Sequence, residues 1–371
     1  MNLNLSEDEK MLQALAERFV QDHYDIEKRR TYLAEPNGYS PKLWSLLSEL
    51  GLIAALFEEA DGGGDLDATG IAVVFEALGR GLAVEPLVEN VVLAGRLFAA
   101  TANAALRDEL LPAIVEGACR VALAHAEAKG RGGQIWVETK AENKGGAHVL
   151  SGEKAYVPAG AGADFFIVSA RSAQSPDSPS GASLYLVPAN APGLTITPWR
   201  MVDGAAAISL KLDGVKVEAP RQLNGGAEAI QQVQTLANLA RAAEALGIME
   251  RIFADTADYL RTREQFGVTL SSFQALQHRM VQNYAAIEQA RALINLALVS
   301  WKTPEFEKAV LGARAFISDA SIALGHDMMQ FHGGMGVTDE LLIGQGHKRL
   351  LVLSRWPDDP DAALDRFAGI A

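Results

Sequence analysis

The sequence reads Arg-Thr-Arg-Glu-Gln-Phe-Gly from Arg261 to Gly267, Phe-Gln at 273–274, and Met-Gln-Phe-His-Gly-Gly-Met-Gly from Met329 to Gly336. Both long phrases place charged, amide or glycine residues where a packed helix would prefer Ala or Leu. A helix C-terminus that requires positive φ explains one glycine, but it does not explain three glycines close to Gln330. We therefore predict that these phrases contact a ligand.

Length and composition set the size and class of the protein. The chain has 371 residues, of which 49% are apolar, so it can bury a large interior and we expect two or three domains. Its 33 basic and 46 acidic residues give a net charge of −13. This balance argues against a nucleic-acid partner and against an anionic membrane surface. Any anionic ligand then requires a locally basic pocket.

Cysteine usage and the N-terminal residues indicate a compartment. Cys119 is the single cysteine and has no intrachain partner for a disulfide, which favours a reducing environment. The start at 1–5 lacks the basic and apolar regions of a signal peptide, and no apolar run reaches membrane-spanning length. We expect a cytoplasmic protein.

The N-terminal part of the sequence has a helical period. Ser6 followed by Glu9 is typical of a capping box, and Leu12, Leu15 and Phe19 fall on one helix face. The glycine run at 62–64 is interpreted as a turn, with a phosphate-binding loop as the weaker alternative.

The middle of the sequence changes to a two-residue period. Ile208, Leu210 and Leu212 alternate with polar or small residues, and the alternation resumes after Asp213-Gly214, where we predict a turn. Further predicted strands lie at Val121–Glu127, Gln134–Thr139, Phe165–Ala170 and Leu184–Val187. From about Gly226 the helical period returns. We predict an N-terminal helical domain over 1–118, a middle β-domain over 119–226 and a C-terminal helical bundle over 227–371.

The order of helices, sheet and helices, together with the two opening phrases, resembles the acyl-CoA dehydrogenase family. Further phrases that resemble the family are Leu43–Leu52, Val74–Pro86 and Leu150–Lys154, so the resemblance covers essentially the whole chain. It implies a mainly α fold with a central β-domain: a helical bundle, a β-barrel or sandwich, and a four-helix bundle.

The resemblance also implies a cofactor and its site. Family members bind FAD between the β-domain and the C-terminal bundle, with the adenine end reaching a neighbouring subunit. Arg263, with Gln265 and Phe266 beside it, stands where the family's arginine meets the pyrophosphate, a task that suits the fork of a guanidinium. A surface ion pair of Arg263 with Glu264 or Asp258 is the alternative. The residues that match adenosine- and ribose-holding positions are Gln274, Gln330, Gly333 and Gly334.

The β-domain departs from the family's flavin-ring phrases. The family's Thr-Glu-Pro becomes Ala126-Glu127-Ala128, and its Lys-x-Trp-Ile-Thr becomes a phrase ending Tyr156-Val157-Pro158. Two ring-facing hydroxyls are therefore missing. Tyr156 can still pack against the ring, and main-chain groups near His125, Ala126 and Val157 can still bond its edge. Core filling is the alternative for Tyr156 and His125.

The family's reaction is α,β-desaturation of an acyl-CoA thioester, in which a carboxylate removes the α-proton while a hydride leaves for the flavin. Counting from Arg349, the residue in the place of the base is Asp358. It lies between two prolines, so an ordinary turn residue is the open alternative. A second family location for the base holds Ala237. Lesser candidates for the base are Glu244 and Glu340.

The segment around Asp358 resembles that of a subgroup linked to steroid or other bulky acyl-CoA breakdown. Expected partners are an acyl-CoA substrate, an electron-transfer flavoprotein or similar acceptor, and further subunits in a homodimer, homotetramer or heterotetramer. Two alternatives remain open: a catalytically silent, flavin-supporting subunit, and an oxygen-using oxidase or monooxygenase of the same fold. The histidines show no zinc spacing, and we predict packing or hydrogen-bonding roles for His332 and His347.

Overall fold

The computed structural model describes residues 5–130, 136–172, 174–178, 181–357 and 359–369. Its contacts group the chain into two units. The first combines residues 1–31 and 67–83 with 238–371, and the second combines 32–66 with 84–237. The domain boundaries expected at 118 and 226 stay a prediction.

The N-terminal third is helical, as its period predicts. Ser6 caps the first helix: its hydroxyl accepts from the Glu9 amide at 3.2 Å, while its own amide donates to the Glu9 carboxylate at 2.6 Å. The predicted capping box is confirmed. The run at 62–64 lies in a turn in which Gly62 has a φ of +86°. The helices in order are α1 (Glu7–His23), α2 (Ile26–Ala34), α3 (Pro41–Glu49), α4 (Leu52–Ala55), α5 (Ala68–Arg80), a π-helix (Leu87–Gly95), α6 (Arg96–Thr101) and α7 (Ala104–Val115).

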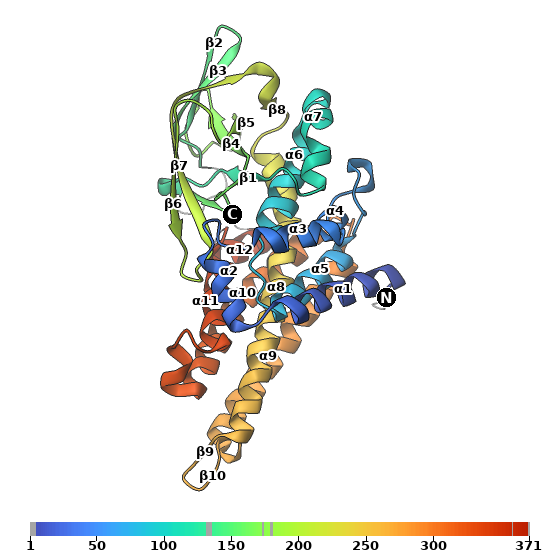
Figure 1. The fold of residues 1–371 in the computed structure, drawn as a ribbon, viewed down its shortest axis with the longest axis vertical. Coiled ribbons are helices and arrows are strands. Elements are labelled where there is room, and N and C mark those ends of the chain that lie inside the picture. The colour runs from blue at the N-terminus through green and yellow to red at the C-terminus, as the bar shows by residue number, and fades with distance from the viewer. Residues whose placement is uncertain (1–4, 131–135, 173, 179–180, 358, 370–371) are drawn as a thin grey trace. The chain divides into compact units, whose positions relative to one another are not determined.

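The middle of the chain forms an eight-stranded sheet in the order β6-β7-β3-β2-β4-β5-β8, with β1 pairing to β4 (Figure 1). Inward-facing side chains such as Phe166, Leu210 and Val215 make its core. The strands are β1 (Val121–Ala124), β2 (Lys140–Lys144), β3 (Ala147–Pro158), β4 (Phe165–Arg171), β5 (Ala182–Pro188), β6 (Leu194–Arg200), β7 (Ala206–Glu218) and β8 (Gln222–Leu223). The predicted fold class, mainly α with a central β region, is confirmed.

Two predicted details of the sheet are wrong. β7 continues through Asp213-Gly214 instead of turning, because β3 is long enough to pair on both sides, and a register shift at Gly152 absorbs the irregularity. Residues 136–139 form no strand, since the amides of Glu138 and Thr139 donate to the side chain of Glu127. Residues 134–135 lie outside the described part of the chain.

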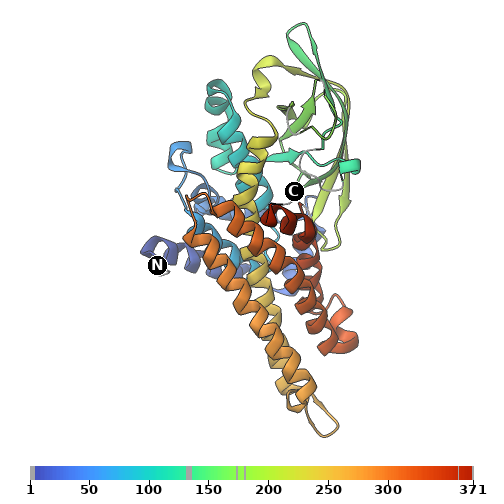
Figure 2. The same cartoon turned by 180° about the vertical axis from the view of Figure 1, so that it is seen from behind.

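The C-terminal region returns to helices, with a short hairpin between the first two. That hairpin is at the far end of α8 and α9 in Figure 1, and Figure 2 shows α9 and α10 side by side from behind. The elements are α8 (Ala227–Thr262), β9 (Glu264–Gln265), β10 (Val268–Thr269), α9 (Gln274–Val299), α10 (Phe306–His332), α11 (Leu342–Arg355) and α12 (Pro360–Ala368).

Glycines let α5 and α8 approach closely. A Cβ on Gly79 would overlap the backbone of Glu244, and one on Gly247 would overlap the carbonyl oxygen of Glu76. Since only glycine allows such an approach, these two positions fix where α8 crosses α5.

Candidate functional site

The segment that follows β1 carries two of the predicted cofactor residues, His125 and Ala126. Ala126 forms an isolated antiparallel bridge with Tyr156, and its carbonyl accepts from the Ala155 amide at 3.0 Å. Val157, next to Tyr156, is fully buried. The fold thus brings together all four predicted residues of the β-domain.

Tyr156 lies in an aromatic cluster that the sequence did not reveal. The register of β3 against β7 shifts between Lys154 and Val157, so the strict alternation of side chains is broken at Tyr156. Its ring centroid is 5.5 Å from that of Trp199, and its hydroxyl donates to the Met201 sulfur at 2.9 Å. Trp199 is 37% exposed, so the cluster presents aromatic surface of the kind that stacks on a planar ring.

Behind the same segment lies a buried polar network. The Lys154 ammonium, which is fully buried, donates to the Glu127 carboxylate at 2.6 Å, the Ser169 hydroxyl at 3.0 Å and the His125 carbonyl at 3.3 Å. Ser169 also lies 2.8 Å from Nδ1 of His125. Because Ser169 accepts from the ammonium, its hydroxyl hydrogen is free to donate to His125.

Charge and burial oppose one another in this network. Burial, reinforced by the charge of Arg171, lowers the pKa of Lys154 to about 8, although Glu127 pulls in the other direction. Burial alone would raise the pKa of Glu127, but the Lys154 charge and hydrogen bonds from Lys154 and Thr139 hold that pKa below its usual value.

The β9–β10 hairpin carries Arg263, Gln265 and Phe266, all exposed. Phe266 is 92% exposed and has a φ of +57°, a conformation that L-residues rarely adopt. Asp258, one of the two partners considered for an ion pair with Arg263, pairs with Arg261 at 2.8 Å. An exposed phenylalanine and an exposed arginine on the same hairpin suit a binding surface.

The second opening phrase forms the end of α10 and the turn after it. Gln330, Gly333 and Gly334 are exposed, and a Cβ added at either glycine would meet open space. Gly333 has a φ of +60°. His332 stacks on Tyr259 with ring centroids 4.3 Å apart, which joins this turn to the end of α8, one helical turn before Arg263. Gln274 is the exposed first residue of α9.

The lesser candidates for the base lie in unlike surroundings. Glu244 is buried, and its two carboxylate oxygens accept from Nε and Nη2 of Arg349 at 2.6 and 3.1 Å. Glu340 is exposed at the edge of a cavity of about 600 Å³ that Tyr259 and His332 also line. Asp358 lies outside the described residues, so its role stays a prediction.

His332 and His347 are both buried. Nδ1 of His332 lies 2.9 Å from the carbonyl of Met328. Burial, together with the nearby His326, lowers the pKa of His347 to about 4, so its imidazole is neutral at physiological pH. These are packing environments, as the sequence predicts for both residues.

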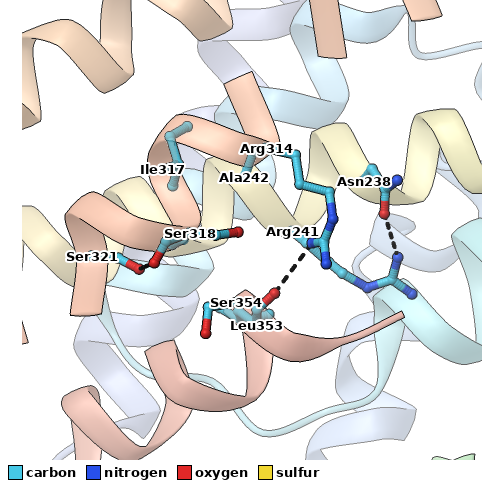
Figure 3. A pocket seen from close by; sticks show the side chains of 10 residues that line it. Asn238, Arg241, Ala242, Arg314, Ile317, Ser318, Ser321, Leu353 and Ser354 are labelled. Carbon is cyan, nitrogen blue, oxygen red and sulfur yellow. Dashed lines mark hydrogen bonds between the residues drawn. The ribbon is translucent and has the colours of Figure 1, made fainter. Parts of the chain in front are cut away.

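A small cavity of about 10 Å³, sufficient for about one water molecule, lies between α8, α10 and α11 (Figure 3). Arg241 and Arg314, 2% and 3% exposed, extend toward it. Arg241 donates to the Asn238 side chain at 3.0 Å, and Arg314 donates to the Leu353 carbonyl at 3.2 Å. Two buried guanidinium groups create a positive environment that favours oxygen acceptors.

Sequence reasoning missed Lys154, Trp199, Arg241 and Arg314 as members of sites. The two arginines did leave a signal, because each interrupts an alanine-rich stretch of a helix that is otherwise buried. Lys154 left no such signal, because its inward position on β3 is known only from the structure.

Comparisons with known proteins define the class. Models of the acyl-CoA dehydrogenase N-terminal, middle and C-terminal domains match residues 6–118, 122–215 and 224–356. The chain belongs to the acyl-CoA dehydrogenase family, a family of flavin-dependent oxidoreductases.

The chain is also similar to individual relatives and solved structures. Acyl-CoA dehydrogenase FadE27 of Mycobacterium tuberculosis is 30% identical over 81% of this chain and 79% of the relative. A variant of the Tcur3481-Tcur3483 steroid ACAD is 30% identical with a TM-score of 0.86, over 98% of this chain and 97% of that one. The ChsE4-ChsE5 complex of M. tuberculosis contains a chain 26% identical with a TM-score of 0.90, over 100% and 98%. No helix in the described part of the chain is long and apolar enough to cross a membrane.

Proposed function

We propose that this protein binds FAD and carries out α,β-dehydrogenation of a bulky acyl-CoA thioester. The observation that carries the proposal is the match of the phrases at 263–266 and 330–334 to the family's FAD-contacting positions, with these residues exposed at the surface: Arg263, Gln265, Phe266, Gln330, Gly333 and Gly334. Membership of the family supplies the reaction class.

The residues present fit the cofactor. The exposed guanidinium of Arg263 has the geometry to bind two phosphate oxygens at once, and Gly333 and Gly334 leave the space that close backbone approach requires. Gln274 and Gln330 offer amide groups for hydroxyls of the adenosine end. The Tyr156–Trp199 cluster offers aromatic surface to the flavin ring. When bound, the flavin supplies the acceptor for the hydride that leaves the β-carbon.

Removal of the α-proton requires a carboxylate from the protein. We assign Asp358 as the base that removes the α-proton, because it stands in the place of the family's glutamate. Glu244 is a poorer base, since both of its oxygens are engaged by Arg349. A base must be within hydrogen-bond reach of the proton that it removes, so the shorter aspartate requires a closely held substrate.

Relatives suggest the substrate class and partners. One similar structure is described as a steroid ACAD and another as a complex of two chains, ChsE4 and ChsE5. We therefore propose a polycyclic or similarly bulky acyl group, an oligomer that can include a related subunit, and an electron-transfer flavoprotein or similar acceptor. The single Cys119 supports a reducing compartment, and we propose the cytoplasm.

The test begins with the protein purified alone and then mixed anaerobically with acyl-CoA. A flavin spectrum of the purified chain, bleached by a bulky acyl-CoA faster than by a straight-chain one, is expected. An absence of flavin after reconstitution with FAD overturns the assignment. Flavin binding without bleaching by any acyl-CoA, alone or with a related subunit, identifies a silent flavin-supporting subunit. Reoxidation by oxygen with turnover identifies an oxidase or monooxygenase.

A further inference from the structure

The segment at 125–127 departs from the Thr-Glu-Pro phrase of the family that the sequence resembles. Ala126 replaces a threonine and Ala128 a proline, so neither a hydroxyl nor a rigid ring is present. If this segment binds a flavin ring, main-chain groups must do so. Main-chain groups bind well only when their geometry is fixed beforehand.

The fold fixes this segment from its inner side. The side chains of His125 and Glu127 both reach the Lys154 network, His125 through Ser169. In an extended segment neighbouring side chains point to opposite sides, so Ala126 faces away from the network. Lys154 also binds the main chain directly, because its ammonium donates to the carbonyl of His125.

The carboxylate of Glu127 extends the network to the chain before β2. It accepts from the Thr139 amide at 3.1 Å and from the Thr139 hydroxyl at 2.6 Å, in addition to the 2.6 Å contact with Lys154. Three segments, at 125–127, at 138–139 and at Lys154 in β3, are thereby joined at one buried charge pair.

Stability alone gives little reason for such a pair. Burying two charges costs desolvation energy, and well-packed apolar residues of similar volume commonly replace a buried pair without loss of stability. A methionine could fill much of the same space as Lys154. An apolar side chain cannot donate hydrogen bonds to the Glu127 carboxylate, the Ser169 hydroxyl and the main-chain carbonyl of His125 at the same time.

We propose that Lys154 is a positioning residue for the cofactor. Its buried ammonium holds the segment at 125–127 so that the face carrying Ala126 presents main-chain groups to the flavin ring. This inference rests on the proposed FAD site and adds to it the residue on which the shape of the ring-binding segment depends.

The test compares four versions of the full-length protein: wild type, Lys154→Met, Lys154→Met with Glu127→Gln, and Lys211→Met. The double variant removes both charges while glutamine keeps an oxygen for Thr139. Lys211 is an exposed lysine of β7 and controls for the substitution itself. For each protein, flavin is removed, FAD is titrated back, and the melting temperature and the spectrum of the bound flavin are recorded.

We expect Lys154→Met to weaken FAD binding about 10- to 100-fold, the range for losing a charged hydrogen-bonding group, and to shift the flavin absorbance bands. The double variant should recover the melting temperature of wild type but not its FAD affinity, and Lys211→Met should match wild type in both. Recovery of FAD affinity together with the melting temperature, or an unchanged affinity in Lys154→Met, overturns the positioning role. Failure of wild type itself to bind FAD instead overturns the proposed function.

Discussion

Glu244→Gln distinguishes a structural carboxylate from a catalytic one. Glu244 on α8 and Arg349 on α11 form a bidentate pair in which the glutamate side chain is 8% exposed and the arginine side chain 21%. The substitution keeps the volume but removes the charge that faces Arg349. Removing one partner of a buried pair costs about 3–5 kcal/mol.

That loss of unfolding free energy can be converted to a decrease in melting temperature. An unfolding entropy of about 2.1 cal/mol/K per residue gives about 0.8 kcal/mol per degree for 371 residues. The melting temperature of Glu244→Gln should therefore fall by about 4–6 °C, as measured by calorimetry. The rate of flavin reduction by acyl-CoA, measured in stopped flow well below the melting temperature, should stay within about twofold of wild type, because losing a base costs about 10² or more.

Glu288→Gln, at an exposed position of α9, is the matched control and should change neither quantity. A Glu244→Gln protein with an unchanged melting temperature and a reduction rate lowered a hundredfold would refute the reasoning and make Glu244 the base.

Arg263→Ala should weaken FAD binding about 10- to 100-fold in a titration, because one charged contact to the pyrophosphate is lost. Arg261→Ala is the control. Equal FAD affinities of the two variants would contradict the assignment of Arg263. Asp358→Asn should slow flavin reduction by about 10² to 10⁴ with the FAD content unchanged. Asp359→Asn, which preserves the cap of α12, should not slow it. Unchanged kinetics in Asp358→Asn would remove Asp358 from the mechanism and place the base on a lesser candidate of this chain or on another chain. The pKa of His347 lies at about 4 in the folded protein and near the ordinary histidine value of 6.5 in the unfolded chain. The unfolded chain therefore binds more protons between these values, so stability should fall as pH drops from about 6.5 to about 4. Denaturation midpoints across that range should flatten in His347→Gln, and an equally steep profile would assign the pH dependence to other groups.

The order of helices, sheet and helices was predictable from the sequence, because it depends on contiguous patterns of hydrophobic residues. A change of hydrophobic period marks a change of element, and a run of charge and glycine that no helix favours marks a surface or a turn. The hairpin with Phe266 and the turn at Gly333 were not predicted as such, although both fall within the phrases that the sequence indicated as ligand-contacting.

Pairing of buried charges was decided only by the tertiary structure. Lys154 meets Glu127 and Ser169, and Glu244 meets Arg349, through elements far apart in the chain. The sequence shows which residues are polar or charged, but the partner of each depends on which strand or helix packs beside it. The same holds for Asp213-Gly214, where a local turn signal was overridden because β3 offers backbone partners on both sides. Long-range contacts outweigh local propensity where they give buried polar groups their hydrogen-bond partners, because a buried polar group without a partner costs more free energy than an unfavourable local conformation.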